Sequence, residues 1–194
     1  MRTIVLASTS QYRRALLEAA GVTHLAASPR FVERHDAAIA PGDLAIALAR
    51  GKAESLAGAY PDALIVGADQ VPALGARVLG KPGSREAAVE QLLALQGRTH
   101  ELHTAVAVHD ARARRTVSRA VRHSMAMRAL TRAQAEDYVA RDAPLDCAGA
   151  YRVEARGALL FESMRGDDHT AIVGLPLTAM SALLLELGCD LLEA

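Results

Sequence analysis

Apolar and polar positions at the start of the chain predict a strand, a small loop and a helix. Residues 3–6 are apolar and mostly β-branched, which favours a buried strand. Residues 7–10 are small, and residues 12–20 have helical spacing that stops at Gly21, a residue typical of helix ends. Because the first N–H groups of a helix have no partner within it, this arrangement predicts an anion site.

A second apolar run, over residues 63–68, predicts a central strand that is covered on both faces. Asp69 and Gln70 are expected to follow its carboxyl end, which is where ligands bind in α/β folds. A carboxylate at that place suits a general base or a metal ligand, and a turn-forming aspartate is the structural alternative. We favour a site, because the polar pair interrupts an apolar run that resumes at Val71.

The rest of the pattern alternates between helical and strand periods. It predicts helices over 41–60, with Asp43 as N-cap, and over 84–95, 131–141 and 178–187. It predicts strands over 22–27, 100–109, 115–127, 152–154 and 159–164, and a hairpin over 74–79. No linker or repeat interrupts the 194 residues, so we expect one large domain or two small lobes.

Composition narrows the range of partners. Hydrophobic residues make up 51% of the chain and aromatic residues 3%, so we expect an aliphatic core and no stacking platform for a single-stranded nucleic acid. Basic and acidic residues number 22 each, so no overall charge attracts a nucleic acid or a membrane surface. No apolar run reaches about 18 residues, and the start lacks the order of a signal peptide. We therefore expect a cytoplasmic protein with neither nucleic acid nor membrane as a partner.

Two arginines stand where the first helix begins, although positive charge there opposes the helix dipole. A bound phosphate would explain them. Arg14 precedes Glu18 by four residues, so an exposed ion pair accounts for it as well. Arg13 lies on the apolar face, where a long side chain either reaches out to solvent or meets a fixed anion. We favour the anion for Arg13.

Further charged residues extend the candidate site. Lys52 interrupts the apolar row of its helix, as a solvent-seeking stem or as a charge aimed at an anion, and Lys81 follows Gly80 as an exposed lysine or a phosphate ligand. Glu33 lies in a polar, irregular stretch, residues 28–36, where spacing alone favours a solvated charge. Several cations with the Asp69 carboxylate suit the hydrolysis of a phosphoanhydride.

Five blocks of the sequence resemble the Maf family of nucleotide pyrophosphatases. They are LASTSQYRRALL at 6–17, GADQV at 67–71, GKP at 80–82, AGAY at 148–151 and VGLPL at 173–177. Each block alone is modest, but five in the expected order and separation are specific, and together they span nearly the whole chain. The resemblance implies a mixed α/β fold with a long central sheet flanked by helices, similar to the inosine triphosphatase fold, with two lobes around a cleft.

The resemblance also implies an activity, which is cleavage of a nucleoside triphosphate to a monophosphate and pyrophosphate with Mg²⁺ or Mn²⁺. Asp69 falls on the proton acceptor of the family and is also expected at the metal. Glu33 falls on an acidic position near that metal, against what its spacing suggests. The phosphate-binding positions of the family fall on Ser8, Arg13, Lys52 and Lys81, and we expect Arg14 beside them. The sequence leaves open whether the chain forms a homodimer.

Three positions favour the branch of the family that hydrolyses 7-methyl-GTP. They are Tyr12, Gln70 and Glu154, where the branch acting on dTTP and UTP usually has Arg, Thr and Gln. Methylation makes guanine cationic, so the Tyr12 ring can stack on it. The Glu154 carboxylate can accept hydrogen bonds from guanine and offset its charge. The structural alternatives are surface packing of Tyr12 and a cross-strand partner for Glu154.

The sequence also departs from the family pattern. Gln11 replaces the usual proline, Val32 replaces an acidic residue, and Thr170 with Ala171 stands where an asparagine is common. These departures leave open a nucleotide-binding regulator of low turnover, linked to cell division. The dTTP and UTP branch with altered specificity residues is a second alternative.

Overall fold

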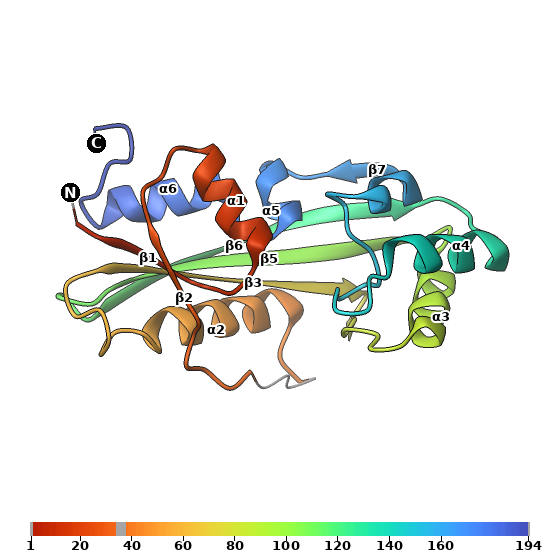
Figure 1. Cartoon of the computed structure of the whole chain (residues 1–194), viewed down its shortest axis with the longest axis horizontal. Helices are drawn as coiled ribbons and strands as arrows, with labels where there is room; N and C mark the ends of the chain where they lie inside the picture. Colours follow the sequence, from red (N-terminus) through yellow and green to blue (C-terminus); the bar gives the residue numbers. More distant parts are fainter. Residues whose placement is uncertain (1, 34–37, 194) are drawn as a thin grey trace. The chain divides into compact units, whose positions relative to one another are not determined.

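The computed structural model of the chain describes residues 2–33 and 38–193 (Figure 1). Residues 34–36 of the irregular stretch expected over 28–36 lie outside the described residues. The strands are β1 (Ile4–Ala7), β2 (Leu25–Ala27), β3 (Leu64–Leu74), β4 (Arg77–Val78), β5 (Thr99–Asp110), β6 (Arg115–Met127) and β7 (Phe161–Arg165). The helices are α1 (Gln11–Ala19), α2 (Pro41–Glu54), α3 (Arg85–Leu95), α4 (Arg132–Asp142), η1 (Arg156–Leu160), α5 (His169–Val173) and α6 (Leu177–Glu186).

Seven strands form one mixed sheet in the order β2-β1-β3-β5-β6-β7, with β4 paired to β3. The strand β1 runs parallel to both of its neighbours, whereas β4 and β7 pair antiparallel with β3 and β6. The predicted α/β class with a central sheet and flanking helices is therefore confirmed. The chain divides into two compact units. The first comprises Met1–Gln70, Thr104–Val121 and Asp168–Ala194, and the second comprises Val71–His103 and Arg122–Asp167.

In the first unit, helices cover both faces of the sheet. Figure 1 shows α1 and α6 on one side of the strands and α2 on the other. On the side of α1 and α6, an aliphatic cluster joins Leu6, Leu17, Val66 and Leu183, all of them buried. Because side chains alternate along a strand, the odd-numbered residues of β3 face α2 instead.

Glycine at position 67 lets α2 approach β3 closely. A Cβ atom at Gly67 would lie 2.2 Å from the carbonyl oxygen of Ala49 and 2.7 Å from the backbone nitrogen of Ala53. No side chain fits between this helix and this strand at position 67. The register of α2 against β3 is therefore set at one point, and residues one turn from Ala49 meet the strand just beyond Gly67.

The second unit has a small aromatic cluster of its own. The Tyr151 hydroxyl lies 2.7 Å from Nε2 of His100, and the Tyr151 and Phe161 rings meet edge to face with centroids 4.9 Å apart. Burial lowers the pKa of His100 to about 4, so that the ring is neutral at neutral pH. Gly149, at φ +87°, is needed here because a Cβ would lie 2.8 Å from the Tyr151 ring. The AGAY block, residues 148–151, thus contributes to packing within this unit.

Several local predictions are wrong, each for a physical reason. Asp69 and Gln70 do not follow the strand but lie inside β3, which continues to Leu74 and turns at Gly75 to pair with β4. Asp43 is not the N-cap of α2, because Pro41 occupies the first helical position and Ala40 is the cap. The helix ends at Glu54 and is followed by turns up to residue 59.

Two further differences lie near the end of the chain. Residues 152–154 form no strand, because the Arg152 N–H donates to the Tyr138 hydroxyl and η1 follows directly. The helix α5 was not predicted, although Asp168 and Gly174 are a start and a stop signal on either side of it. Among the described residues, every helix is too short or too polar to cross a bilayer.

Candidate active site

Three charged side chains of the first unit meet where α2 passes β3. Asp69 points to α2, and its Oδ1 atom accepts a hydrogen bond from Nζ of Lys52. The same Nζ atom lies 2.8 Å from Oε1 of Glu33. The side chains of Lys52 and Asp69 are 9% and 11% exposed, so a nearly buried ammonium bridges two carboxylates. Lys52 therefore does not reach out to solvent, and Glu33 does not stand alone as a solvated charge.

Lys52 reaches Asp69 because of the helix register set at Gly67. Lys52 lies next to Ala53 and three residues after Ala49, on the side of α2 that packs against the glycine. Two residues after Gly67, Asp69 points to the same side of β3. The close approach of backbone to backbone thus positions a buried carboxylate opposite a buried cation.

The loop after β1 supplies polar groups at the start of α1. Ser10 caps the helix, and its hydroxyl accepts from the Arg13 N–H. The buried Ser8 hydroxyl accepts from the Ser10 N–H at 3.1 Å and from a terminal nitrogen of Arg13 at 3.4 Å. The predicted strand, loop and helix start are confirmed, with Gly21 at φ +69° after the helix.

Arg13 is half-buried, and its guanidinium is held by a backbone carbonyl. Its Nε atom donates to the carbonyl oxygen of Gly174 at 2.8 Å. Burial lowers the pKa of the Arg13 guanidinium, and the negative charges of Asp69 and Glu33 act in the opposite direction. An arginine stays charged in proteins, so Arg13 brings a positive charge within the electrostatic reach of both carboxylates.

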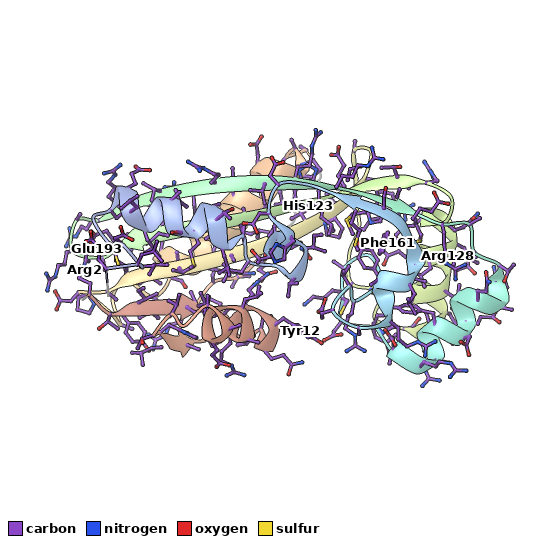
Figure 2. All side chains as sticks on the ribbon, turned by 90° about the horizontal axis from the view of Figure 1, so that it is seen from above. Arg2, Tyr12, His123, Arg128, Phe161 and Glu193 are labelled. Atoms are coloured by element: carbon purple, nitrogen blue, oxygen red, sulfur yellow. The ribbon has the colours of Figure 1, made fainter. Side chains whose placement is uncertain are left out.

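The two neighbours of Arg13 differ in exposure. Tyr12 is partly exposed at the amino end of α1 (Figure 2). Arg14 is exposed, and in the described part of the chain it forms no ion pair with Glu18. The ion pair that the spacing suggested for Arg14 is therefore absent among these residues.

Gln70 points to the opposite face of β3 from Asp69. Its side-chain nitrogen donates to the carbonyl oxygens of Ala171 and Ile172, at 2.9 and 3.0 Å, and to Oγ1 of Thr104 at 3.1 Å. The polar pair at the middle of β3 is thus divided between two helices, α2 for Asp69 and α5 for Gln70.

Asp168 joins the starts of α5 and α6. One carboxylate oxygen accepts from the N–H and the hydroxyl of Thr170, and the other accepts from the N–H and the hydroxyl of Thr178. Burial raises the pKa of Asp168, but these four hydrogen bonds outweigh it and the net pKa is below the ordinary value. A charged carboxylate therefore fixes the segment that presents Gly174.

Lys81 and Glu154 belong to the second unit. Lys81 is exposed in the segment after β4, and Glu154 is exposed in the turn before η1. Their roles as phosphate and base ligands stay predictions. Burial raises the pKa of Cys147 to about 12, which leaves this thiol protonated and unreactive at neutral pH.

The carboxylates of Glu33 and Asp69 match what a magnesium ion needs from a protein. Mg²⁺ is usually bound by one or two carboxylates together with phosphate oxygens and water. No group of three or more metal-binding side chains occurs in residues 2–33 and 38–193, so the protein alone offers an incomplete shell there. A substrate that brings its own phosphate oxygens would complete such a shell.

Sequence reasoning missed Thr104 and Gly174 as parts of the site. Thr104 lies inside β5, where other polar residues such as His100 and Glu101 also occur, so one more threonine gives no signal. Gly174 was noticed only as part of a family block. The start and stop signals of α5, Asp168 followed by Thr170 and then Gly174, were the available hint.

The chain is similar to a known family and to named relatives. The profile of the family described as Maf-like protein matches residues 3–187. The chain is 43% identical to a protein of Syntrophotalea carbinolica named 7-methyl-GTP pyrophosphatase, over 99% of this chain and 98% of that protein. Proteins of the same name from Aromatoleum aromaticum and Pseudomonas aeruginosa are 44% and 38% identical to it, over 93% and 98% of this chain and 93% and 100% of theirs.

Replacement of Asp168 by asparagine should destabilise the fold in a pH-dependent way. An amide has one accepting oxygen where the carboxylate has two, so Asp168→Asn should cost about 1–3 kcal/mol of unfolding free energy at neutral pH. Because the folded pKa of Asp168 is lowered, its contribution is complete above the unfolded value of about 4 and is lost as pH falls through the folded value. The difference in unfolding free energy between the wild type and Asp168→Asn should therefore become smaller at acidic pH.

Urea unfolding near neutral pH and near pH 3 measures this gap. Asp190→Asn is the matched control, because that carboxylate accepts a single backbone hydrogen bond, from Leu192, and should cost under about 0.5 kcal/mol. A gap between wild type and Asp168→Asn that does not change with pH would contradict the assignment.

Proposed function

The chain belongs to the Maf-like family, and on this premise we propose that it hydrolyses 7-methyl-GTP to 7-methyl-GMP and pyrophosphate. The observation that supports the activity best is the arrangement of Asp69, Lys52 and Arg13 in the first unit. A buried carboxylate that is paired with one cation and is within electrostatic reach of a second, in the first turn of a helix, is suited to phosphoanhydride hydrolysis. The names of the relatives support the choice of substrate.

The phosphate chain would lie at the start of α1. Ser8 supplies a hydroxyl, α1 supplies backbone N–H groups, and Arg13 supplies terminal guanidinium nitrogens. Lys52 is balanced by Glu33 and Asp69 in the free protein. A polyphosphate would compete for its ammonium and so leave the carboxylates available for other partners.

Asp69 would act as the general base. Water attacks phosphorus, the anhydride bond between the α- and β-phosphates breaks, and pyrophosphate leaves. The proton of the attacking water passes to the Asp69 carboxylate, which the protein holds nearly buried beside Lys52. A base fixed in this way loses little freedom when it reaches the transition state.

We also propose a divalent cation at Glu33 and Asp69. When bound there, Mg²⁺ or Mn²⁺ would offset the negative charge that develops on the phosphate oxygens. The fit rests on the donor chemistry, because two carboxylates, one from a loop and one from a strand, both pair with the Lys52 ammonium and so lie near each other. The proposed substrate belongs to the nucleotide pool of the cytoplasm, where we place the activity.

Selection of the base would depend on Tyr12 and Glu154. The Tyr12 ring, accessible at the start of α1, suits stacking on a cationic purine. A carboxylate at Glu154 suits the N1–H and amino groups of guanine. A pyrimidine offers neither the positive charge nor that pair of donors, so both residues favour 7-methyl-GTP over dTTP and UTP.

Loss of the Asp69 carboxylate should abolish turnover. Asp69→Asn removes the proton acceptor while keeping size and shape, so pyrophosphate release should fall by about 10²–10⁴-fold. Circular dichroism should show an intact fold. Asp43→Asn, which changes an exposed acid in the first turn of α2, is the matched control and should keep full activity. Full activity of Asp69→Asn would remove it as the base.

The purified protein should prefer 7-methyl-GTP. In a panel with GTP, dTTP and UTP, followed by pyrophosphate release, kcat/KM should be highest for 7-methyl-GTP. Glu154→Gln should reduce this preference by about tenfold or more, because a hydrogen bond to a charged group is lost. Glu162→Gln, at an exposed position of β7, is the control. Faster turnover of dTTP or UTP by the wild type would place the protein in the other branch.

Removal of divalent ions should stop the reaction. Activity should disappear in excess EDTA and return with Mg²⁺ or Mn²⁺. Glu33→Gln should raise the concentration of metal needed for half-maximal rate, because one of two carboxylate ligands is lost. Full turnover in EDTA would refute the metal, and tight nucleotide binding without metal-dependent turnover would favour a regulator.

A further inference from the structure

We infer that Thr104 and Gln70 are positioning residues that hold α5 so that its end aims Arg13 at the phosphate chain of the substrate. The inference rests on the proposed function, because Arg13 is assigned there to phosphate. It concerns a chain of contacts within the first unit, from β3 and β5 through α5 to α1. Thr104 had no role in the sequence analysis, and Gln70 was expected to bind the substrate directly.

The side-chain nitrogen of Gln70 donates its hydrogen bonds to α5 and to Thr104. Carbonyl oxygens only accept hydrogen bonds, so the Gln70 atom facing Ala171 and Ile172 must be the nitrogen. That nitrogen has two hydrogens and lies within hydrogen-bond distance of three acceptors, the third being Thr104 Oγ1. It has no N–H left to donate to a nucleobase. The side-chain nitrogen of Gln70 therefore acts on the substrate through the helix that it holds.

Thr104 uses its hydroxyl in both directions. The residue is fully buried, and its hydroxyl donates to the Ala171 carbonyl at 2.9 Å while it accepts from the Gln70 amide at 3.1 Å. Two side chains from neighbouring strands thus converge on one carbonyl oxygen of α5. A buried polar group whose partners are all satisfied is rigid, because any movement leaves a group unpaired.

The helix α5 needs this support. It has five residues, which is too short to be stable by its own hydrogen bonds. Asp168 fixes its first turn, and Thr104 with Gln70 fixes its middle. Its last residue leads to Gly174, whose φ of +111° ends the helix in a conformation that side chains rarely adopt.

Gly174 is the point of contact with Arg13. The Gly174 carbonyl accepts from Arg13 Nε at 2.8 Å, and a Cβ atom at Gly174 would come within 3.4 Å of the same nitrogen. A guanidinium is planar, so a bond to Nε on one edge fixes the direction of the two terminal nitrogens on the other. One of these already lies 3.4 Å from the Ser8 hydroxyl. Displacement of α5 would therefore misdirect the phosphate-binding edge.

A double-mutant cycle tests the inference. Thr104→Val keeps the shape but removes the hydroxyl, and it should lower kcat/KM for 7-methyl-GTP by about tenfold, since misplacing a catalytic group by 1 Å can cost about 10²-fold. In the Arg13→Ala background the same change should cost less than about twofold, because its target is absent. Thr104→Ser, which keeps the hydroxyl, should restore most of the activity.

Thr116→Val is the matched control. It removes a hydroxyl whose hydrogen-bond partners, Glu54 and His109, lie in the same unit and outside α5, and should leave kcat/KM within about twofold. If the wild type hydrolyses nucleotides but the losses of kcat/KM caused by Thr104→Val and Arg13→Ala simply multiply in the double mutant, the inference is overturned. The proposed function then still stands.

Side-chain NMR separates the inference from the proposed function. The Nε–H signal of Arg13, protected by the Gly174 carbonyl, should exchange with water at least about tenfold faster in Thr104→Val and at the wild-type rate in Thr116→Val. Unchanged exchange in Thr104→Val would refute the contact chain whatever the activity. If exchange is faster in Thr104→Val but the wild type neither binds nor hydrolyses nucleotides, the contacts that position Arg13 are supported. Their role in phosphate binding is then refuted.

Discussion

The ammonium of Lys52 between two carboxylates is the interaction on which the site depends. Burial of an isolated charge is costly, and a buried ion pair is tolerated only where both partners are well placed. The placement comes from backbone packing, because glycine at position 67 lets α2 approach β3 so closely that Lys52 reaches Asp69. The fold thus provides a site in which charges are concentrated before any substrate arrives.

The strand β3 serves two faces at once. Successive side chains point in opposite directions, so Asp69 faces α2 and Gln70 faces α5. The proposed base and the proposed support of Arg13 are therefore adjacent in sequence but lie on different faces of the sheet. If both proposals hold, a change at position 70 alters the geometry of Arg13 without touching the Asp69 carboxylate.

The start of the chain was predictable to within a residue or two, because it follows from local rules. Apolar β-branched residues form β1, Ser10 caps α1 and Gly21 ends it. Asp69 was predicted at the end of a strand, but it lies inside β3, and its role as the base stays a prediction. The spacing of Glu33 suggested a solvated charge, because its partner Lys52 is distant in sequence and only the folded chain joins them.

The sequence by itself determined most of the local elements, the polar loop at the start of α1 and the family to which the chain belongs, since periodicity, capping residues and motif blocks are local features of the chain. Only the tertiary structure decided which charged side chains meet, and that the side-chain nitrogen of Gln70 is hydrogen-bonded to α5. Lys52, Glu33 and Asp69 come from three separate segments, and Arg13 depends on a carbonyl 161 residues away. Such contacts follow from the packing of helices on a sheet, which no short stretch of sequence specifies.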